Sequence, residues 1–225
     1  DVIPSRTTPF ITVTLIAFNA LAFAYQLSLG DAVDGFIRSF ALVPAQFSWP
    51  TVVTSMFLHG GLLHFGGNML YLWIFGDNVE DRMGHGRFLL FYLLCGTAAA
   101  VAQTISSPDS LLPMLGASGA IAGVMGAYFV LFPHARIVAL FPIFVFFKVI
   151  EVPAILFLGF WFLMQLMSGV GSVAATTAGE PTGGIAIWAH VAGFVAGLTG
   201  VFLLDRKSTR LNSSHVKRSR MPSSA

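Results

Sequence analysis

Residues 116–132 read GASGAIAGVMGAYFVLF, an apolar run that opens on a glycine-containing segment and stops before a proline. The run predicts a helix over 118–132. A membrane-spanning helix needs about 20 apolar residues, so this helix is short for a full crossing. A helix that begins within the membrane leaves the preceding backbone to be shielded by protein or by a water-filled cavity. The segment from Gly116 to Gly119 is therefore where chemistry is expected.

The composition indicates that the lipid bilayer is the solvent of this chain. Hydrophobic residues make up 56% of the 225 residues and charged residues 10%, and the mean hydropathy is +0.79. Soluble domains carry about 25% charged residues, so these few charges would not cover a water-facing surface. We predict an all-α membrane protein with one domain over residues 1–205, built as a bundle of six transmembrane helices. The six segments are 9–27, 62–76, 87–105, 118–132, 152–167 and 187–204.

The connections between these helices differ in character. Residues 30–51 mix aromatic and charged side chains, which fits either a segment at the membrane interface or an ordinary ordered loop. Residues 77–86 form a short charged connection. Residues 135–151 are apolar but interrupted, and we expect a partly buried connector there, not a crossing. Residues 169–184 are rich in Gly, Ala and Thr, which predicts a mobile loop.

Basic residues divide unevenly between the two sides of such a bundle. Arg38 stands alone on one side, and the other side carries Arg6, Arg82, Arg87, Arg136, Lys148, Arg206 and Lys207. The positive-inside rule then predicts that both termini face the cytoplasm. Residues 206–225 form a basic polar tail, which we interpret as disordered or foreign to the fold. The alternative for this tail is binding to anionic lipid headgroups.

Four polar side chains fall at membrane depth, where such groups are costly and often functional. His64 and Asn68 are four residues apart and share one helix face. Alone, they could serve only to hydrogen-bond neighbouring helices. Ser118 opens its helix, where free N–H groups and the positive end of the dipole favour an oxyanion, although a plain helix cap is the alternative. His190 lies early in the last helix.

The helices that carry Ser118 and His190 share a pattern of small residues. The glycines among them are Gly119, Gly123, Gly126, Gly193 and Gly197. Such spacing lets two helices touch backbone to backbone, which would bring Ser118 within reach of His190, the base that a serine nucleophile needs. No carboxylate lies in these helices, so the pair would be a dyad. Because no carboxylate accompanies the histidines and HExxH is absent, a metal site is disfavoured.

Three stretches together resemble the rhomboid family of intramembrane serine proteases. They read His59-Gly-Gly-Leu-Leu-His64-Phe-Gly-Gly-Asn68, Gly116-Ala117-Ser118-Gly119 and Ala189-His190-Val191-Ala192-Gly193. The resemblance implies a six-helix core whose active site opens to the extracytoplasmic side. It implies Ser118 as the nucleophile and His190 as the general base.

The resemblance also implies the surroundings of this pair. The side chains of His64 and Asn68, with the Ser118 N–H, would form the oxyanion hole, and His59 would support the histidine cluster. Gly116 and Gly119 would permit the tight loop, and Gly193 the close helix packing.

The family acts on single-pass transmembrane proteins within the lipid bilayer, so such substrates are the expected partners. No cofactor, metal or nucleic acid is implied. Residues 169–184 would be a cap over the site and the fifth helix a lateral gate. The expected location is a bacterial or archaeal cell membrane, as a multi-pass protein. Two alternatives are an inactive relative that binds transmembrane clients and a small transporter, although no internal repeat supports the latter.

Overall fold

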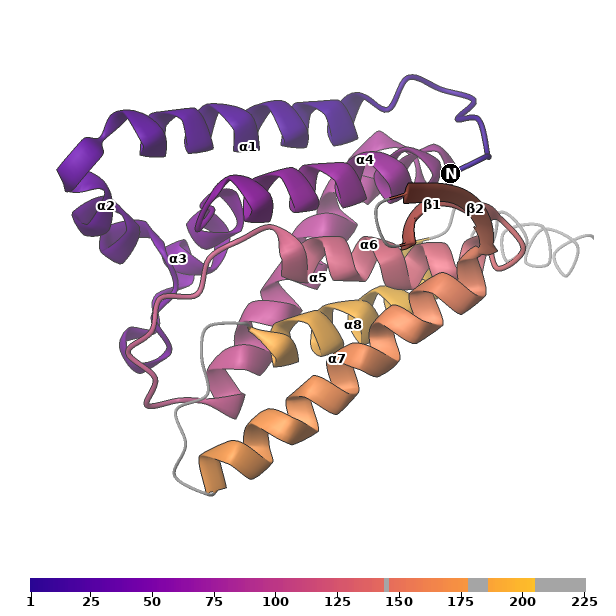
Figure 1. Cartoon of the computed structure of the whole chain (residues 1–225). Helices are drawn as coiled ribbons and strands as arrows, with labels where there is room; N and C mark the ends of the chain where they lie inside the picture. Colours follow the sequence, from indigo (N-terminus) through magenta and orange to yellow (C-terminus); the bar gives the residue numbers. More distant parts are fainter. Residues whose placement is uncertain (144–145, 178–185, 205–225) are drawn as a thin grey trace, which may run out of the picture.

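The computed structural model describes residues 1–143, 146–177 and 186–204. Within these residues, six long helices form one bundle (Figure 1). Their bounds are α1 (Phe10–Ser28), α4 (Leu62–Met83), α5 (His85–Ser106), α6 (Ser118–Leu131), α7 (Ala154–Thr177) and α8 (Ile187–Leu204). Four of them, α1, α5, α7 and α8, are long and apolar enough to cross a membrane, and α6 is a shorter apolar helix. The predicted all-α membrane bundle is therefore confirmed.

Helix α6 forms the centre of the bundle, where it lies between α4 and α8, with α5 against it (Figure 1). All its residues from Gly119 to Tyr128 are buried. Its contact with α8 is made by backbone atoms. A β-carbon at Gly193 would overlap the carbonyl oxygen of Gly119, and one at Gly197 would overlap that of Gly123. The backbone-to-backbone packing predicted from the glycines is present.

Helix α4 is longer than the sequence indicated, because the predicted charged connection over 77–86 is mostly helical. Glu80 is fully buried, and its carboxylate accepts hydrogen bonds from the N–H groups of Ile11 and Thr12 at 2.8 and 2.7 Å. These N–H groups open α1 and have no acceptor within their own helix. The charge therefore caps another helix instead of marking a loop. Gly84, with φ +86°, alone separates α4 from α5.

Helix α7 also extends further than predicted. Residues up to Thr177 are helical, so the first part of the expected mobile loop over 169–184 is wrong. Gly169 lies where a β-carbon would be 3.2 Å from the Trp188 ring, and this packing against α8 favours the helix over the loop that its composition suggested. Residues 178–185 lie outside the described residues, as does the tail over 206–225.

The connector between α6 and α7 is an antiparallel hairpin of β1 (Arg136–Ile143) and β2 (Phe146–Pro153). It lies beside the N-terminus and the α4–α5 turn (Figure 1), and the Val2 N–H donates to the Arg136 carbonyl at 3.1 Å. The basic residues Arg6, Arg82, Arg87 and Arg136 thus belong to segments at one end of the bundle. Ser118 opens α6 at the opposite end, since α6 runs toward the hairpin.

The long first connection is ordered by short helices. They are η1 (Gly30–Ala32), α2 (Val33–Phe40), η2 (Pro44–Gln46), α3 (Trp49–Thr54) and η3 (Ser55–Phe57). Leu42 exchanges two backbone hydrogen bonds with Met114, at 3.0 and 2.7 Å, and the Gly116 N–H donates to the Ser55 carbonyl at 2.8 Å. The backbone groups of Met114 and the N–H of Gly116 are therefore paired within the protein, as a helix that begins within a membrane requires.

Candidate active site

The turn into α6 fixes the position of Ser118. Gly116 has φ +126°, a conformation that favours glycine. A β-carbon built at Gly116 would also lie 2.8 Å from Nε2 of His64. Both the backbone conformation and the lack of space therefore require glycine two residues before Ser118.

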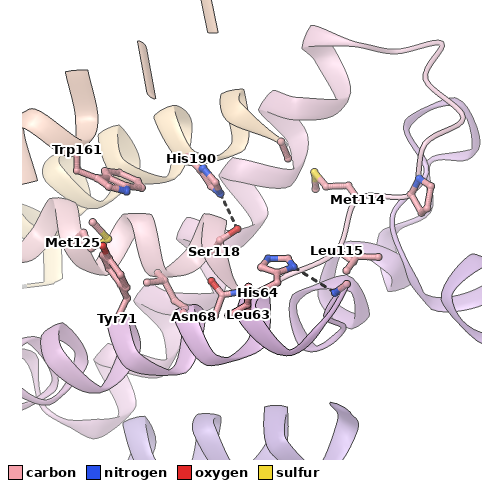
Figure 2. A pocket seen from close by; sticks show the side chains of 15 residues that line it. Leu63, His64, Asn68, Tyr71, Met114, Leu115, Ser118, Met125, Trp161 and His190 are labelled. Atoms are coloured by element: carbon pink, nitrogen blue, oxygen red, sulfur yellow. Dashed lines mark hydrogen bonds between the residues drawn. The ribbon is translucent and has the colours of Figure 1, made fainter. Parts of the chain in front are cut away.

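Ser118 and His190 meet across the contact of α6 with α8. Oγ of Ser118 lies 2.8 Å from Nε2 of His190, although the two residues are 72 positions apart (Figure 2). On α6, Gly119 follows Ser118, and its carbonyl oxygen lies against Gly193 of α8. This close glycine contact is one residue from Ser118 and about one turn from His190, and it holds the two side chains at the same depth. The contact that the spacing of small residues predicted is present.

His64 and Asn68 lie one turn apart on α4 and face the same space as Ser118 (Figure 2). The Gly60 N–H donates to Nδ1 of His64 at 3.4 Å. Since Nδ1 accepts, the ring proton sits on Nε2, which is directed at Gly116. Asn68 is 8% exposed, and its Nδ2 has no hydrogen-bond partner among the residues that the structure describes. The two side chains thus bring N–H donors with free capacity to the turn before Ser118.

Four polar side chains line one cavity of about 580 Å³: those of His64, Asn68, Ser118 and His190. The rest of its wall is mostly apolar and comes from several elements (Figure 2). The lining includes Leu63, Tyr71, Met114, Leu115, Met125 and Trp161. Among the residues that the structure describes, this lining contains no Asp, Glu, Lys or Arg, and N–H donors and the start of α6 contribute to the electrostatics of the site.

His59 does not line the cavity. It is 2% exposed, and its backbone is paired with the side-chain amide of Gln26, which accepts from the His59 N–H at 3.0 Å and donates to the His59 carbonyl at 3.2 Å. Its ring lies edge-on to that of His64, with centroids 5.3 Å apart. His59 therefore packs behind His64, away from Ser118.

Three glutamines around the site were missed by the sequence interpretation. Besides Gln26, Gln103 on α5 accepts a hydrogen bond from the Ala189 N–H in the first turn of α8, at 3.2 Å. Gln165 on α7 places Oε1 at 2.9 Å from Nδ1 of His190. The signal was available, because each glutamine is a polar residue in an apolar run. The pair of Ser118 and His190 therefore has a third polar neighbour, the amide of Gln165, at the place that a carboxylate occupies in a catalytic triad.

Comparison with known proteins agrees with this architecture. The family model of the Rhomboid domain matches residues 46–207, a span that contains α4 to α8 and all four cavity-lining polar side chains. The chain belongs to the rhomboid family, and it is an integral membrane protein.

The chain is similar to individual curated members of this family. It is 36% identical over 124 residues to Rhomboid protease GluP of Bacillus subtilis, covering 55% of this chain and 24% of that protein. It is 33% identical to Rhomboid protein 1, mitochondrial, of Saccharomyces cerevisiae, covering 48% of this chain and 33% of the relative. It is 32% identical to the mouse Presenilin-associated rhomboid-like protein, mitochondrial, covering 60% and 37%.

The chain thus spans well under half the length of each of these relatives. Two of the three are named as mitochondrial proteins, so the expected bacterial or archaeal origin is not supported by these comparisons.

Proposed function

We propose that this protein is an intramembrane serine endopeptidase, in which Ser118 is the nucleophile and His190 the general base. The observation that carries the proposal is the 2.8 Å contact between Ser118 Oγ and His190 Nε2 inside a cavity of a membrane bundle. A serine hydroxyl becomes a competent nucleophile when a base accepts its proton in this way.

The proposed reaction has two steps. Oγ of Ser118 attacks the carbonyl carbon of the scissile peptide bond as Nε2 of His190 takes the hydroxyl proton. The imidazolium then gives this proton to the leaving amine, and the acyl group remains on Ser118. Water, deprotonated by the same Nε2, attacks the ester carbonyl, and the imidazolium then returns this proton to Oγ of Ser118 as the acid is released.

We propose that the negative charge of each tetrahedral intermediate forms near Gly116, because a β-carbon built there would lie 2.8 Å from Nε2 of His64 and 3.6 Å from Nδ2 of Asn68. We assign the oxyanion hole to the Ser118 N–H, Nε2–H of His64 and Nδ2 of Asn68. The unpaired state of the Asn68 amide supports this assignment, because a buried donor without a partner is held ready for a charge that forms only during reaction. His59 supports the ring of His64 from behind.

The cavity also supports a substrate class. Its apolar wall suits an extended segment of a transmembrane helix with small or apolar side chains, and single-pass transmembrane proteins within the lipid bilayer are the proposed partners. The site lies at the end of the bundle away from the segments that carry Arg6, Arg82, Arg87 and Arg136. The positive-inside rule then puts both termini in the cytoplasm and the cut near the outer face of the membrane.

The proposed domain is residues 1–205, with the tail over 206–225 not needed for the reaction. A client-binding protein without activity is the rival function. A transmembrane reporter in proteoliposomes separates the two, because a client-binding protein would retain the reporter uncut.

The test is cleavage of this reporter together with labelling by a fluorophosphonate probe. We expect the wild-type protein to cut and to label, and Ser118→Ala and His190→Ala to do neither. Ser28→Ala, at an exposed serine at the end of α1, is the matched control and keeps both activities. Cleavage that persists in Ser118→Ala would refute the assignment.

A further inference from the structure

Gln165 contacts the ring nitrogen of His190 that is turned away from Ser118. It lies on α7, and its Oε1 is 2.9 Å from Nδ1 of His190, whose Nε2 is 2.8 Å from Ser118 Oγ. The imidazole thus bridges an amide oxygen and a hydroxyl group. The carbonyl oxygen of an amide has lone pairs and no proton, so Nδ1 must donate in this contact.

The position of one proton follows from this contact. A neutral imidazole carries a single N–H, and a proton on Nδ1 leaves a lone pair on Nε2, facing the Ser118 hydroxyl. The reverse tautomer would point an N–H at Ser118 and could not accept its proton. The ring of Trp161 also lies near that of His190, with centroids 6.0 Å apart, and an indole ring in such a tilted contact does not select between tautomers. His64 lines the same cavity as His190.

The backbone of α8 is held independently of Gln165. The Ala189 N–H in its first turn donates to Gln103, and Gly193 and Gly197 pack against α6. The contact with Gln165 therefore adds little to the position of the helix. The contact with Gln165 instead affects which tautomer the His190 ring adopts.

We propose that Gln165 is a positioning residue that holds His190 in the Nδ1–H tautomer, so that Nε2 is free to accept the proton of Ser118. This inference rests on the proposed function for its catalytic consequence, whereas the tautomer itself is a property of the resting protein. The pair of Ser118 and His190 thereby gains a neutral third member, the side-chain amide of Gln165. Because an amide cannot become charged, it orients the ring without placing an ion in the membrane.

Two substitutions of similar length separate orientation from packing. Gln165→Met removes the acceptor and keeps the bulk. Gln165→Glu keeps an oxygen acceptor in either protonation state of its carboxyl group. Leu163→Met, at an exposed leucine of the same helix, is the control for a changed lipid-facing surface.

The first measurement is the ring ¹⁵N chemical shifts of His190 in detergent-solubilised protein, which distinguish a protonated from an unprotonated ring nitrogen. The resonances are assigned by their loss in His190→Ala. We expect Nδ1–H in the wild-type protein and in Gln165→Glu, and a mixture of both tautomers in Gln165→Met. An Nε2–H ring in the wild-type protein overturns the proposal.

The second measurement is cleavage of a transmembrane reporter by the same variants. We expect kcat of Gln165→Met to fall about tenfold with KM unchanged, since one net hydrogen bond is at stake, and Gln165→Glu and Leu163→Met to stay near wild type. Wild-type kcat in Gln165→Met overturns the proposal, as does a loss in Gln165→Met that Gln165→Glu fails to avoid. A wild-type protein that neither cuts nor labels defeats the proposed function instead, and the ¹⁵N shifts then decide the role of Gln165 alone.

Discussion

Gly116 and His64 compete for one space: a β-carbon at position 116 would lie 2.8 Å from Nε2 of the His64 ring. Gly116→Ala should therefore push this ring away from the proposed position of the oxyanion. We expect kcat to fall about 100-fold, the usual loss for one oxyanion donor. Steady-state cleavage in proteoliposomes measures it. His64→Ala should show a loss of similar size, and a Gly116→Ala protein with normal turnover would show that His64 is not a donor.

Asn68 should contribute to the transition state and little to substrate binding. We expect Asn68→Ala to lower kcat about 100-fold with KM nearly unchanged, because its donor is engaged only when the oxyanion forms. The loss should be smaller than that of Ser118→Ala. Leu70→Ala, at an exposed position of the same helix, serves as the control. A rise in KM alone would assign Asn68 to substrate binding.

The contact of α6 with α8 should not accept a methyl group. We expect Gly197→Ala to destabilise the fold by about 1–3 kcal/mol, as overpacking usually does, and to reduce probe labelling of Ser118, since the added carbon separates the two backbones. Unfolding in a graded series of denaturing detergent measures the first effect. Gly171→Ala, where nothing lies within 4 Å of the added carbon, should keep the probe labelling and should not destabilise the fold, because Ala is favoured over Gly within a helix. Equal stability of the two variants would contradict the close packing.

Glu80 should stabilise the junction of α1 with α4. Glu80→Ala leaves the Ile11 and Thr12 N–H groups without their acceptor, and we expect a loss of about 3 kcal/mol. The same unfolding assay measures it. Glu151→Ala, which removes an exposed contact of 3.7 Å with Arg136, should cost less than about 1 kcal/mol. Matching losses in the two variants would refute the proposed cap on α1.

Removal of the tail should leave the reaction intact. A protein that ends at residue 205 should cut the transmembrane reporter and label with the fluorophosphonate probe at the rate of the full chain. The reason is that the cavity and its polar side chains lie wholly between Gly60 and His190. Rates measured side by side in vesicles with and without anionic lipid check this. A loss of rate confined to anionic vesicles would support a lipid-binding tail instead.

Local features of the sequence predicted much of this architecture. The last helix has the bounds expected from its apolar run, Ile187–Leu204, and the spacing of Gly193 and Gly197 predicted which helix it touches. Costly polar residues at membrane depth indicated the cavity side chains. These patterns predict structure correctly because each depends only on residues that are close together in the sequence.

The features that were missed depend on partners distant in the chain. Glu80 looks like a loop residue until its carboxylate is seen against the first turn of α1, 68 and 69 positions away. The hairpin between Arg136 and Pro153 pairs two apolar strands that carry no turn signal strong enough to separate them from an irregular connector. Gln165 reads as an isolated amide in α7, and only the arrangement of α7 against α8 gives it His190 as a partner.

The glycine contact between α6 and α8 has a consequence for how the site tolerates change. Between Gly119 and Gly193, and between Gly123 and Gly197, one backbone rests directly on another, with no side chain to adjust its rotamer and absorb an error. The distance between the Ser118 hydroxyl and the His190 imidazole is therefore set by how the backbones of α6 and α8 pack. Substitutions along this line would alter the alignment of the reacting atoms even where they leave every polar residue in place.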